Sequence, residues 1–329
     1  MLGLGKRWSF LVRVLLAGAS GTIGRATAQA LVSQGHDVLC ALRPGSSVAI
    51  AGPTKVTCQL TEAGSLTHAL GGQRIDAVIS CMATRTGAIA DAWTVEHDAQ
   101  VHLLREAGEA GAQHFVLLSA ICVQKPELAF QKAKAKFEQR LRTSGLNWSI
   151  VRPTAFFKSL SGQVARVQAG KPYHVFGDGT QTACKPISDR DLAQFLVLCL
   201  TDADKRDALL PIGGPGPAIT PLEQGRRLFE ILGKPPKIRR VPYLMMDGIV
   251  ATTNLLGRIS TRAAEKAEFA RTGRYYATES MLVWNETTGR YDASATPVFG
   301  SDLLWDYYRD LIEGRTSADL GAHAYFTRK

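Results

Sequence analysis

Three glycines, Gly18, Gly21 and Gly24, recur at every third position directly after an apolar run over 12–17. The glycines are followed by a helical stretch near 23–34. This order of apolar run, glycine loop and helix favours a dinucleotide-binding unit over an ordinary strand-to-helix turn. Gly18 would form the tight turn, Gly21 would let backbone approach a pyrophosphate, and Gly24 would let the helix pack on the strand. The residues predicted to hold the dinucleotide here are Gly18, Ser20, Gly21, Thr22, Ile23 and Gly24.

Arg43 ends the next apolar run, about 20 residues further along the chain. An enzyme that uses NAD would place a carboxylate there against the ribose 2′-hydroxyl, whereas a planar guanidinium suits a 2′-phosphate. We therefore predict NADPH as the cofactor. The alternative is that Arg43 is a solvated charge at a strand end.

The GxxGxxG spacing resembles the short-chain dehydrogenase/reductase superfamily, especially its extended and atypical members. In that superfamily the helix after the fifth strand carries YxxxK, whose Tyr protonates an alkoxide while the Lys holds the nicotinamide ribose. The matching positions here are Phe130 and Lys134, so the lysine is retained and the phenol is absent. The resemblance implies that Lys134 and Ser119, at the end of the fifth strand, are the catalytic residues.

Without a phenol, this site favours a reaction that depends on hydride transfer, such as reduction of a polarised C=C bond. The alternative is that Lys134 belongs to a solvated helix face with Lys132 and Lys136. Glu138 follows Lys134 by four residues, a spacing that predicts a structural ion pair within the helix.

Two further positions follow from the superfamily resemblance. In its members, the backbone at the end of the sixth strand lies beside the carboxamide of the nicotinamide. Pro153 and Thr154 occupy that position here. The alternative is that these two residues only pack in the core. They often hold the adenine with an Asp after the third strand. Gln59 lies in that region instead and would offer its amide.

The elements that must position these residues are short apolar runs that alternate with helical stretches. This cadence predicts an α/β fold with a doubly wound parallel Rossmann sheet and a smaller C-terminal substrate lobe. We predict an NADP-binding domain over 1–153 and a substrate-binding lobe over 154–329, partly interwoven with the Rossmann core. The predicted strands are 12–17, 38–42, 56–60, 77–80, 115–119 and 149–151, and the cadence breaks down from about Pro153.

The composition bounds the class of protein. With 329 residues, 45% hydrophobic and 21% charged, the chain is typical of a globular protein that is not disordered. We found no apolar stretch long enough to span a membrane, and we interpret residues 1–17 as leading into the first strand rather than as a signal peptide. Six scattered cysteines predict free thiols, a cytoplasmic location and no metal site.

The net charge is +10, from 39 Lys and Arg against 29 Asp and Glu. The positive charge could serve nucleic acid, an anionic membrane surface, or an anionic cofactor and substrate, and nucleic acid is the least supported because the basic residues are spread along the chain. Peripheral contact with a membrane and the oligomeric state stay open.

Several segments together resemble the divinyl chlorophyllide a 8-vinyl-reductase family, over about 12–313. They include LSAICVQKP (118–126), IVRPTAFFKSL (150–160), FGDG (176–179), CKPISD (184–189), ESMLVW (279–284) and TPVFGSD (296–302). The resemblance implies NADPH-dependent conversion of the C8 vinyl group of a divinyl (proto)chlorophyllide to ethyl. It places the enzyme in chlorophyll and bacteriochlorophyll biosynthesis, with a tetrapyrrole substrate.

A flat apolar macrocycle with a propionate needs aromatic walls and a cation. The residues predicted to bind it are Phe156, Phe157, Lys158, Tyr276 and Trp284. The alternatives are an NADP-sensing, NmrA-like regulator without turnover, an isoflavone-reductase-like C=C reductase, and a structural subunit of a membrane assembly.

Overall fold

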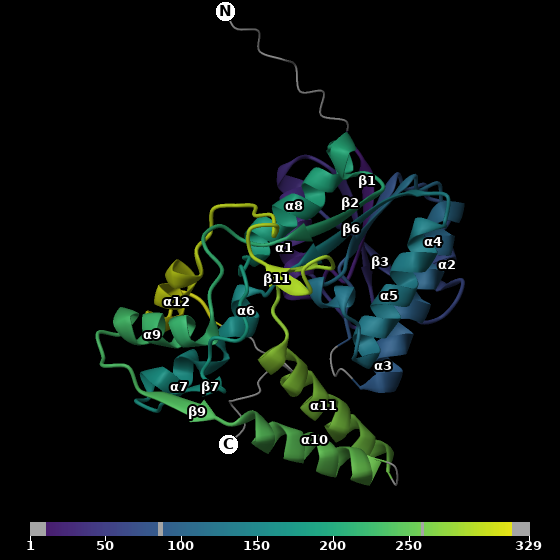
Figure 1. Ribbon diagram of the computed structural model, residues 1–329. Helices are drawn as coiled ribbons and strands as arrows, with labels where there is room; N and C mark the ends of the chain where they lie inside the picture. The colour runs from purple at the N-terminus through teal and green to yellow at the C-terminus, as the bar shows by residue number, and fades with distance from the viewer. Residues whose placement is uncertain (1–10, 85–87, 258–259, 318–329) are drawn as a thin grey trace, which may run out of the picture.

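A seven-stranded parallel sheet forms the centre of the computed structural model, which describes residues 11–84, 88–257 and 260–317 (Figure 1). The strand order is β3-β2-β1-β4-β5-β6-β8. The strands are β1 (Arg13–Ala17), β2 (Asp37–Leu42), β3 (Thr54–Thr57), β4 (Ala77–Ser80), β5 (His114–Leu118), β6 (Asn147–Pro153) and β8 (Ala208–Ile212). The predicted Rossmann fold class is confirmed. The third strand ends earlier than predicted, which leaves Gln59 in the loop after it.

Both faces of this sheet are covered by helices, which is why its strands are apolar without alternation. On β1, Val14 and Leu16 pack in the same core as α1 (Thr22–Ser33) and α8 (Asp189–Thr201). Leu15 and Ala17 pack in the opposite core, which contains side chains of α2 (Ser65–Leu70), α4 (Ala99–Glu109) and α5 (Ala129–Arg142).

The second half of the chain completes the sheet. β8 pairs in parallel with β6, and α8 packs in the same core as α1. Residues 189–212, which the sequence assigned to a lobe partly interwoven with the Rossmann core, therefore contribute a helix and a strand to the Rossmann layers. Residues 154–188 lie between β6 and α8 in the sequence and interrupt the alternation of strands and helices. The chain then returns to the sheet, where α8 and β8 extend the same layers. The division at residue 153 stays a prediction.

A second group of elements has its own core around Phe229 and Tyr308. It comprises α6 (Phe157–Leu160), α7 (Val164–Gln168), β7 (Tyr173–Phe176), α9 (Pro221–Ile231), β9 (Ile238–Val241) and α12 (Leu304–Ile312). Strands β7 and β9 pair in parallel. In Figure 1 these elements lie to the left of and below the large sheet.

Two smaller units follow β9. Helices α10 (Tyr243–Gly257) and α11 (Thr261–Thr278) run side by side at the bottom of Figure 1, and β10 (Val283–Asn285) and β11 (Arg290–Asp292) form an antiparallel hairpin. The remaining elements are α3 (Ile89–Trp93), the π-helix η1 (Thr94–Asp98) and the 3-10 helices η2 (Ile121–Gln124), η3 (Ser161–Gln163) and η4 (Ala203–Lys205).

Within the described residues no helix is long and apolar enough to span a bilayer. In the same part of the chain no cluster of three or more His, Cys, Asp or Glu side chains has a metal-binding arrangement. The interpretation of residues 1–10 as a lead-in falls outside the described residues. All six cysteines are free thiols, as predicted, and all except Cys81 are buried.

Candidate active site

The glycine loop joins the carboxyl end of β1 to α1. Gly18 has a φ of +81°, and a Cβ on it would lie 2.6 Å from the backbone of Cys81, after β4. A Cβ on Gly24 would lie 2.1 Å from the carbonyl oxygen of Gly18, so only glycine lets the helix start this close to the loop. A Cβ on Gly21 would meet only that same oxygen, at 3.4 Å. The backbone at Gly21 is therefore open to a ligand, and this cradle fits a dinucleotide pyrophosphate at the helix N-terminus.

An open depression lies beside the carboxyl end of β2. It is lined by residues 43–46 of the β2 loop together with Gln59 and Glu62. The predicted 2′-phosphate residue Arg43 and the predicted adenine residue Gln59 are thus brought to one place. The nearby carboxylate of Glu62 was not anticipated.

Lys134 is buried on α5 and forms an ion pair with Glu96, whose Oε2 lies 2.7 Å from the lysine Nζ. The side chains are 9% and 1% exposed, respectively, so Lys134 is not on a solvated helix face. Glu96 Oε1 also accepts a hydrogen bond of 2.8 Å from the backbone N–H of Thr84. The predicted pair between Lys134 and Glu138 is wrong, because the two side chains have different partners from other elements.

Glu138 binds Ser119 and Arg152 instead. Ser119 Oγ donates to Glu138 Oε1 over 2.5 Å, and Arg152 contacts both carboxylate oxygens of Glu138 through Nε and Nη2. Ser119 and Glu138 are each 4% exposed. This network fixes the Ser119 hydroxyl at the carboxyl end of β5 and engages its proton.

The end of β6 is held by its neighbours. The backbone N–H of Thr154 donates to Ile212 on β8 over 2.9 Å, and its hydroxyl donates to the carbonyl of Lys185. Pro153 and Thr154 are both buried. Their packing is therefore established, and their predicted role beside the nicotinamide stays a prediction.

The structure separates the five predicted substrate residues. Phe157 is 5% exposed in the core of the second group and its ring packs at a tilt against Tyr307, while Phe156 packs against the sheet core on the α1 and α8 side. Lys158 reaches the glycine loop, where its Nζ donates to Thr22 Oγ1 over 3.1 Å. Tyr276 lies on α11 with 43% of its surface exposed. Trp284 is half-buried on β10.

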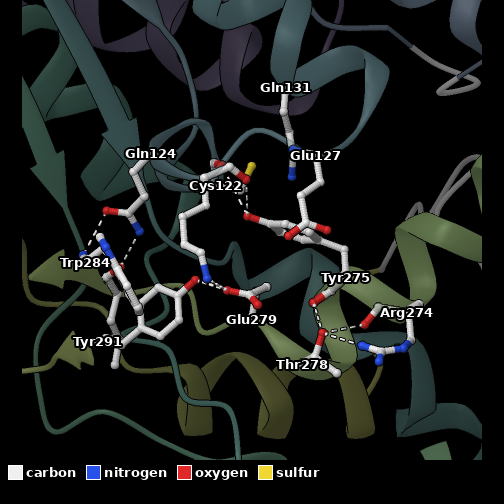
Figure 2. Close-up of polar contacts among 12 residues, drawn as sticks. Cys122, Gln124, Glu127, Gln131, Arg274, Tyr275, Thr278, Glu279, Trp284 and Tyr291 are labelled. Atoms are coloured by element: carbon white, nitrogen blue, oxygen red, sulfur yellow. Dashed lines mark hydrogen bonds and ion pairs between the residues drawn. The ribbon is translucent and has the colours of Figure 1, made fainter. Parts of the chain in front are cut away.

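The β10–β11 hairpin is docked on the segment that follows Ser119 (Figure 2). The amide of Gln124 contacts β10 twice, because Nε2 donates to the carbonyl of Leu282 over 2.7 Å and Oε1 accepts from Trp284 N–H over 2.9 Å. Lys125 Nζ lies 4.4 Å from the centre of the Trp284 ring and 2.6 Å from Glu279 Oε2. The hairpin therefore positions Trp284 near the predicted active site.

Cys122 lies where α5, α11 and the segment after Ser119 meet. The Tyr275 hydroxyl contacts the carbonyls of Cys122 and Lys125 at 3.2 and 3.1 Å (Figure 2). Burial raises the pKa of the Cys122 thiol to about 11, while Lys134 and Tyr276 are among the neighbours that act in the opposite direction. Tyr276 and Lys134 thus both favour the charged form of this thiol.

Sequence reasoning missed several residues of this region: Glu96, Gln124, Lys125, Glu279 and Tyr291, whose ring centre lies 5.5 Å from Lys125 Nζ. Glu96 sits on the π-helix η1, a type of irregularity that is frequent at functional sites and has no simple sequence signal. Gln124 and Lys125 lie within the motif LSAICVQKP (118–126). Their roles depend on contacts with residues far along the chain, which the sequence does not show.

Residues 18–203 match the family model described as NAD(P)H-binding. The chain is 45% identical to the chloroplastic divinyl chlorophyllide a 8-vinyl-reductase of Oryza sativa subsp. indica, over 95% of this chain and 82% of the relative. It is 43% identical to that of Arabidopsis thaliana, over 94% of this chain and 79% of the relative. A solved leucoanthocyanidin reductase–NADPH complex from Vitis vinifera has a similar fold, with a TM-score of 0.65 and 14% identity over 92% of this chain and 99% of that one.

The glycine cradle, the retained lysine and the near full-length similarity agree. This chain belongs to the divinyl chlorophyllide a 8-vinyl-reductase family of NAD(P)H-binding proteins.

Proposed function

We propose that this protein uses NADPH to reduce the C8 vinyl group of divinyl chlorophyllide a or divinyl protochlorophyllide a to an ethyl group. The observation that carries this proposal is the 43–45% identity to four curated 8-vinyl-reductases over about 95% of the chain. The reaction belongs to chlorophyll and bacteriochlorophyll biosynthesis.

The reaction adds one hydride and one proton across a C=C bond. NADPH, when bound, supplies the hydride to the terminal vinyl carbon, and the conjugated macrocycle delocalises the resulting negative charge. The inner carbon then takes the proton. Because no ketone is reduced, the phenol that Phe130 replaces is not required.

Lys134 is our preferred proton donor. Its ammonium group is held by Glu96 at the end of the sheet where the glycine loop lies, and it has protons to give. Ser119 is less suited, because its hydroxyl proton is already donated to Glu138. We propose that Ser119, with Glu138 and Arg152 behind it, positions the nicotinamide end of the cofactor. Water is the remaining candidate donor.

The tetrapyrrole would lie between the carboxyl edge of the sheet and the second group of elements. We propose Tyr276 and Trp284 as aromatic walls, since both rings are partly exposed beside the Ser119 segment. Phe156 would extend this wall, with Phe157 supporting it from the core.

The test is absorption spectroscopy with purified protein, NADPH and divinyl chlorophyllide a. Loss of a conjugated vinyl group shifts the Soret band to the blue, and we expect a shift that requires both protein and NADPH. No shift, with NADPH still bound tightly, would favour an NADP-sensing regulator or a structural subunit. Turnover of other C=C substrates alone would favour an isoflavone-reductase-like enzyme.

The cytoplasmic location and peripheral contact with the photosynthetic membrane stay predictions. Leu244, Met245 and Ile249 on α10 are 79%, 54% and 49% exposed, which supports a contact there. Co-sedimentation with vesicles of anionic lipid tests it, and protein that stays in the supernatant at low salt would exclude it.

A further inference from the structure

Lys158 lies on an element of the second group, but its side chain contacts the glycine loop of the Rossmann sheet. It lies on α6, and its ammonium group donates to the hydroxyl of Thr22, the first residue of α1. Thr22 is within the loop where the pyrophosphate of a dinucleotide is bound. The Lys158 side chain therefore ends at the loop that is predicted to hold the pyrophosphate.

A cation at this position is unfavourable unless an anion accompanies it. The N-terminus of a helix carries a partial positive charge, which repels an ammonium group. The first turn of α1, Thr22 to Arg25, is described in full and holds no acidic residue. Arg25 adds a second cation there, and its Nη1 donates to the carbonyl of Ser20 over 2.8 Å.

Asp189 supplies part of the compensating charge from the first turn of α8. Burial raises the pKa of its carboxyl group, while the nearby Lys158 and Arg25 act in the opposite direction. Lys158 and Arg25 thus bring two positive charges to the N-terminus of α1, and Asp189 is the acidic group that they act on. These positive charges suit the two negative charges of a pyrophosphate.

We propose that Lys158 binds the pyrophosphate of NADPH and does not bind the substrate propionate. The proposal rests on the NADPH site of the proposed function and is independent of the tetrapyrrole. The sequence had assigned Lys158 to the residues that bind the substrate, and this proposal assigns it to the cofactor.

This contact also connects the cofactor to the predicted substrate wall. Phe156 and Phe157 precede Lys158, and the Phe157 N–H donates to Ile187, two residues before Asp189, over 3.2 Å. A bound pyrophosphate would therefore hold the start of α6 and the start of α8 against the loop.

The experiment measures dissociation constants by calorimetry for NADPH, NADH and 2′-AMP, which carries the 2′-phosphate and lacks the pyrophosphate. Lys158→Met should weaken NADPH and NADH about equally, by roughly 10-fold or more, and leave 2′-AMP unchanged. Lys158→Arg should recover most of the loss, because a guanidinium also binds phosphate. Lys171→Met, which removes an exposed lysine from the same half of the chain, should change none of the three constants.

The melting temperature of each variant without cofactor shows whether it is folded, and Lys158→Arg keeps the test valid if Lys158→Met is not. Unchanged NADPH and NADH constants in a folded Lys158→Met variant would overturn the proposal. So would a variant in which only the KM for the tetrapyrrole rises. Since the constants are measured without substrate, this result is distinct from a failure to reduce a vinyl group.

Discussion

Lys134 and Glu138 lie one helical turn apart on α5, and each is neutralised by a residue from a different element. Lys134 pairs with Glu96 on η1, and Glu138 pairs with Arg152 on β6. A buried charge must find a partner, and tertiary neighbours supply one with less solvent than a helix surface does. The i,i+4 rule therefore predicted the wrong pair.

The catalytic role of Lys134 is best tested in a charge-balanced variant. Lys134→Met alone would leave Glu96 buried without its cation, at a cost of about 3–5 kcal/mol. We expect the double variant Lys134→Met with Glu96→Gln to remain folded and to lose about 100-fold or more in kcat, measured by the Soret shift. Lys132→Met, on the exposed face of the same helix, is the control. Turnover by the double variant close to that of the wild type would exclude Lys134 as proton donor.

Arg43 should determine the choice between NADPH and NADH. Arg43→Glu would repel a 2′-phosphate and could accept a hydrogen bond from a 2′-hydroxyl. We expect the dissociation constant for NADPH to rise by about 10-fold or more, while that for NADH does not rise. Lys55→Glu, an equal charge change on the exposed edge strand β3, controls for the net charge. An Arg43→Glu variant that binds NADPH as well as the wild type would contradict the assignment.

At the scale of elements, the glycine loop was predictable because its requirements are local. The turn, the backbone approach and the helix contact all involve residues within one short segment. The contact of Gly18 with Cys81 adds a requirement from another strand, since β1 and β4 are neighbours in the sheet.

Gly18→Ala should therefore destabilise the protein and abolish cofactor binding. The positive φ alone costs about 1–2 kcal/mol for an L-residue, and the contact with Cys81 adds to it. Gly108→Ala is the matched control, because it lies within α4 and its Cβ would meet no atom within 4 Å. We expect that control to gain about 0.5–1 kcal/mol in urea unfolding. Equal melting temperatures for the two variants would refute this account.

We expect His114 on β5 to make the free energy of unfolding depend on pH. Burial, aided by the charge of Arg206, lowers its pKa from 6.5 to about 4. The unfolded chain therefore binds an extra proton between these values, and the free energy of unfolding falls as the pH is lowered through that window, by up to about 1.4 kcal/mol per pH unit. His114→Gln should reduce this slope in urea unfolding between about pH 7 and about pH 5. A slope equal to that of the wild type would show that His114 does not titrate there.

At the scale of the whole molecule, the second half of the chain contributes elements and side chains to the Rossmann half at several points. It supplies α8 and β8 to the sheet, Lys158 to the glycine loop, and the β10–β11 hairpin to the segment after Ser119. The two halves are therefore joined around the proposed site.

Gln124→Ala tests the hairpin contact. It leaves the Leu282 carbonyl and the Trp284 N–H without their partner, at a cost of about 1–3 kcal/mol. We expect faster hydrogen exchange at Trp284 and a higher KM for the tetrapyrrole, with little change in the dissociation constant of NADPH. Gln139→Ala, at an exposed position of α5, is the control. An unchanged KM together with faster exchange would show that the hairpin does not contact the substrate.

The amino-acid sequence by itself determined the fold class, the glycine loop and the family. These features depend on the spacing of residues within short segments and on the order of those segments, and both are visible in a single sequence. The tertiary structure alone decided the partner of each charge: Glu96 for Lys134, Arg152 and Ser119 for Glu138, and Thr22 for Lys158. Burial forces such groups to pair, but which groups meet depends on how distant segments pack, and a single sequence carries no local signal of that packing.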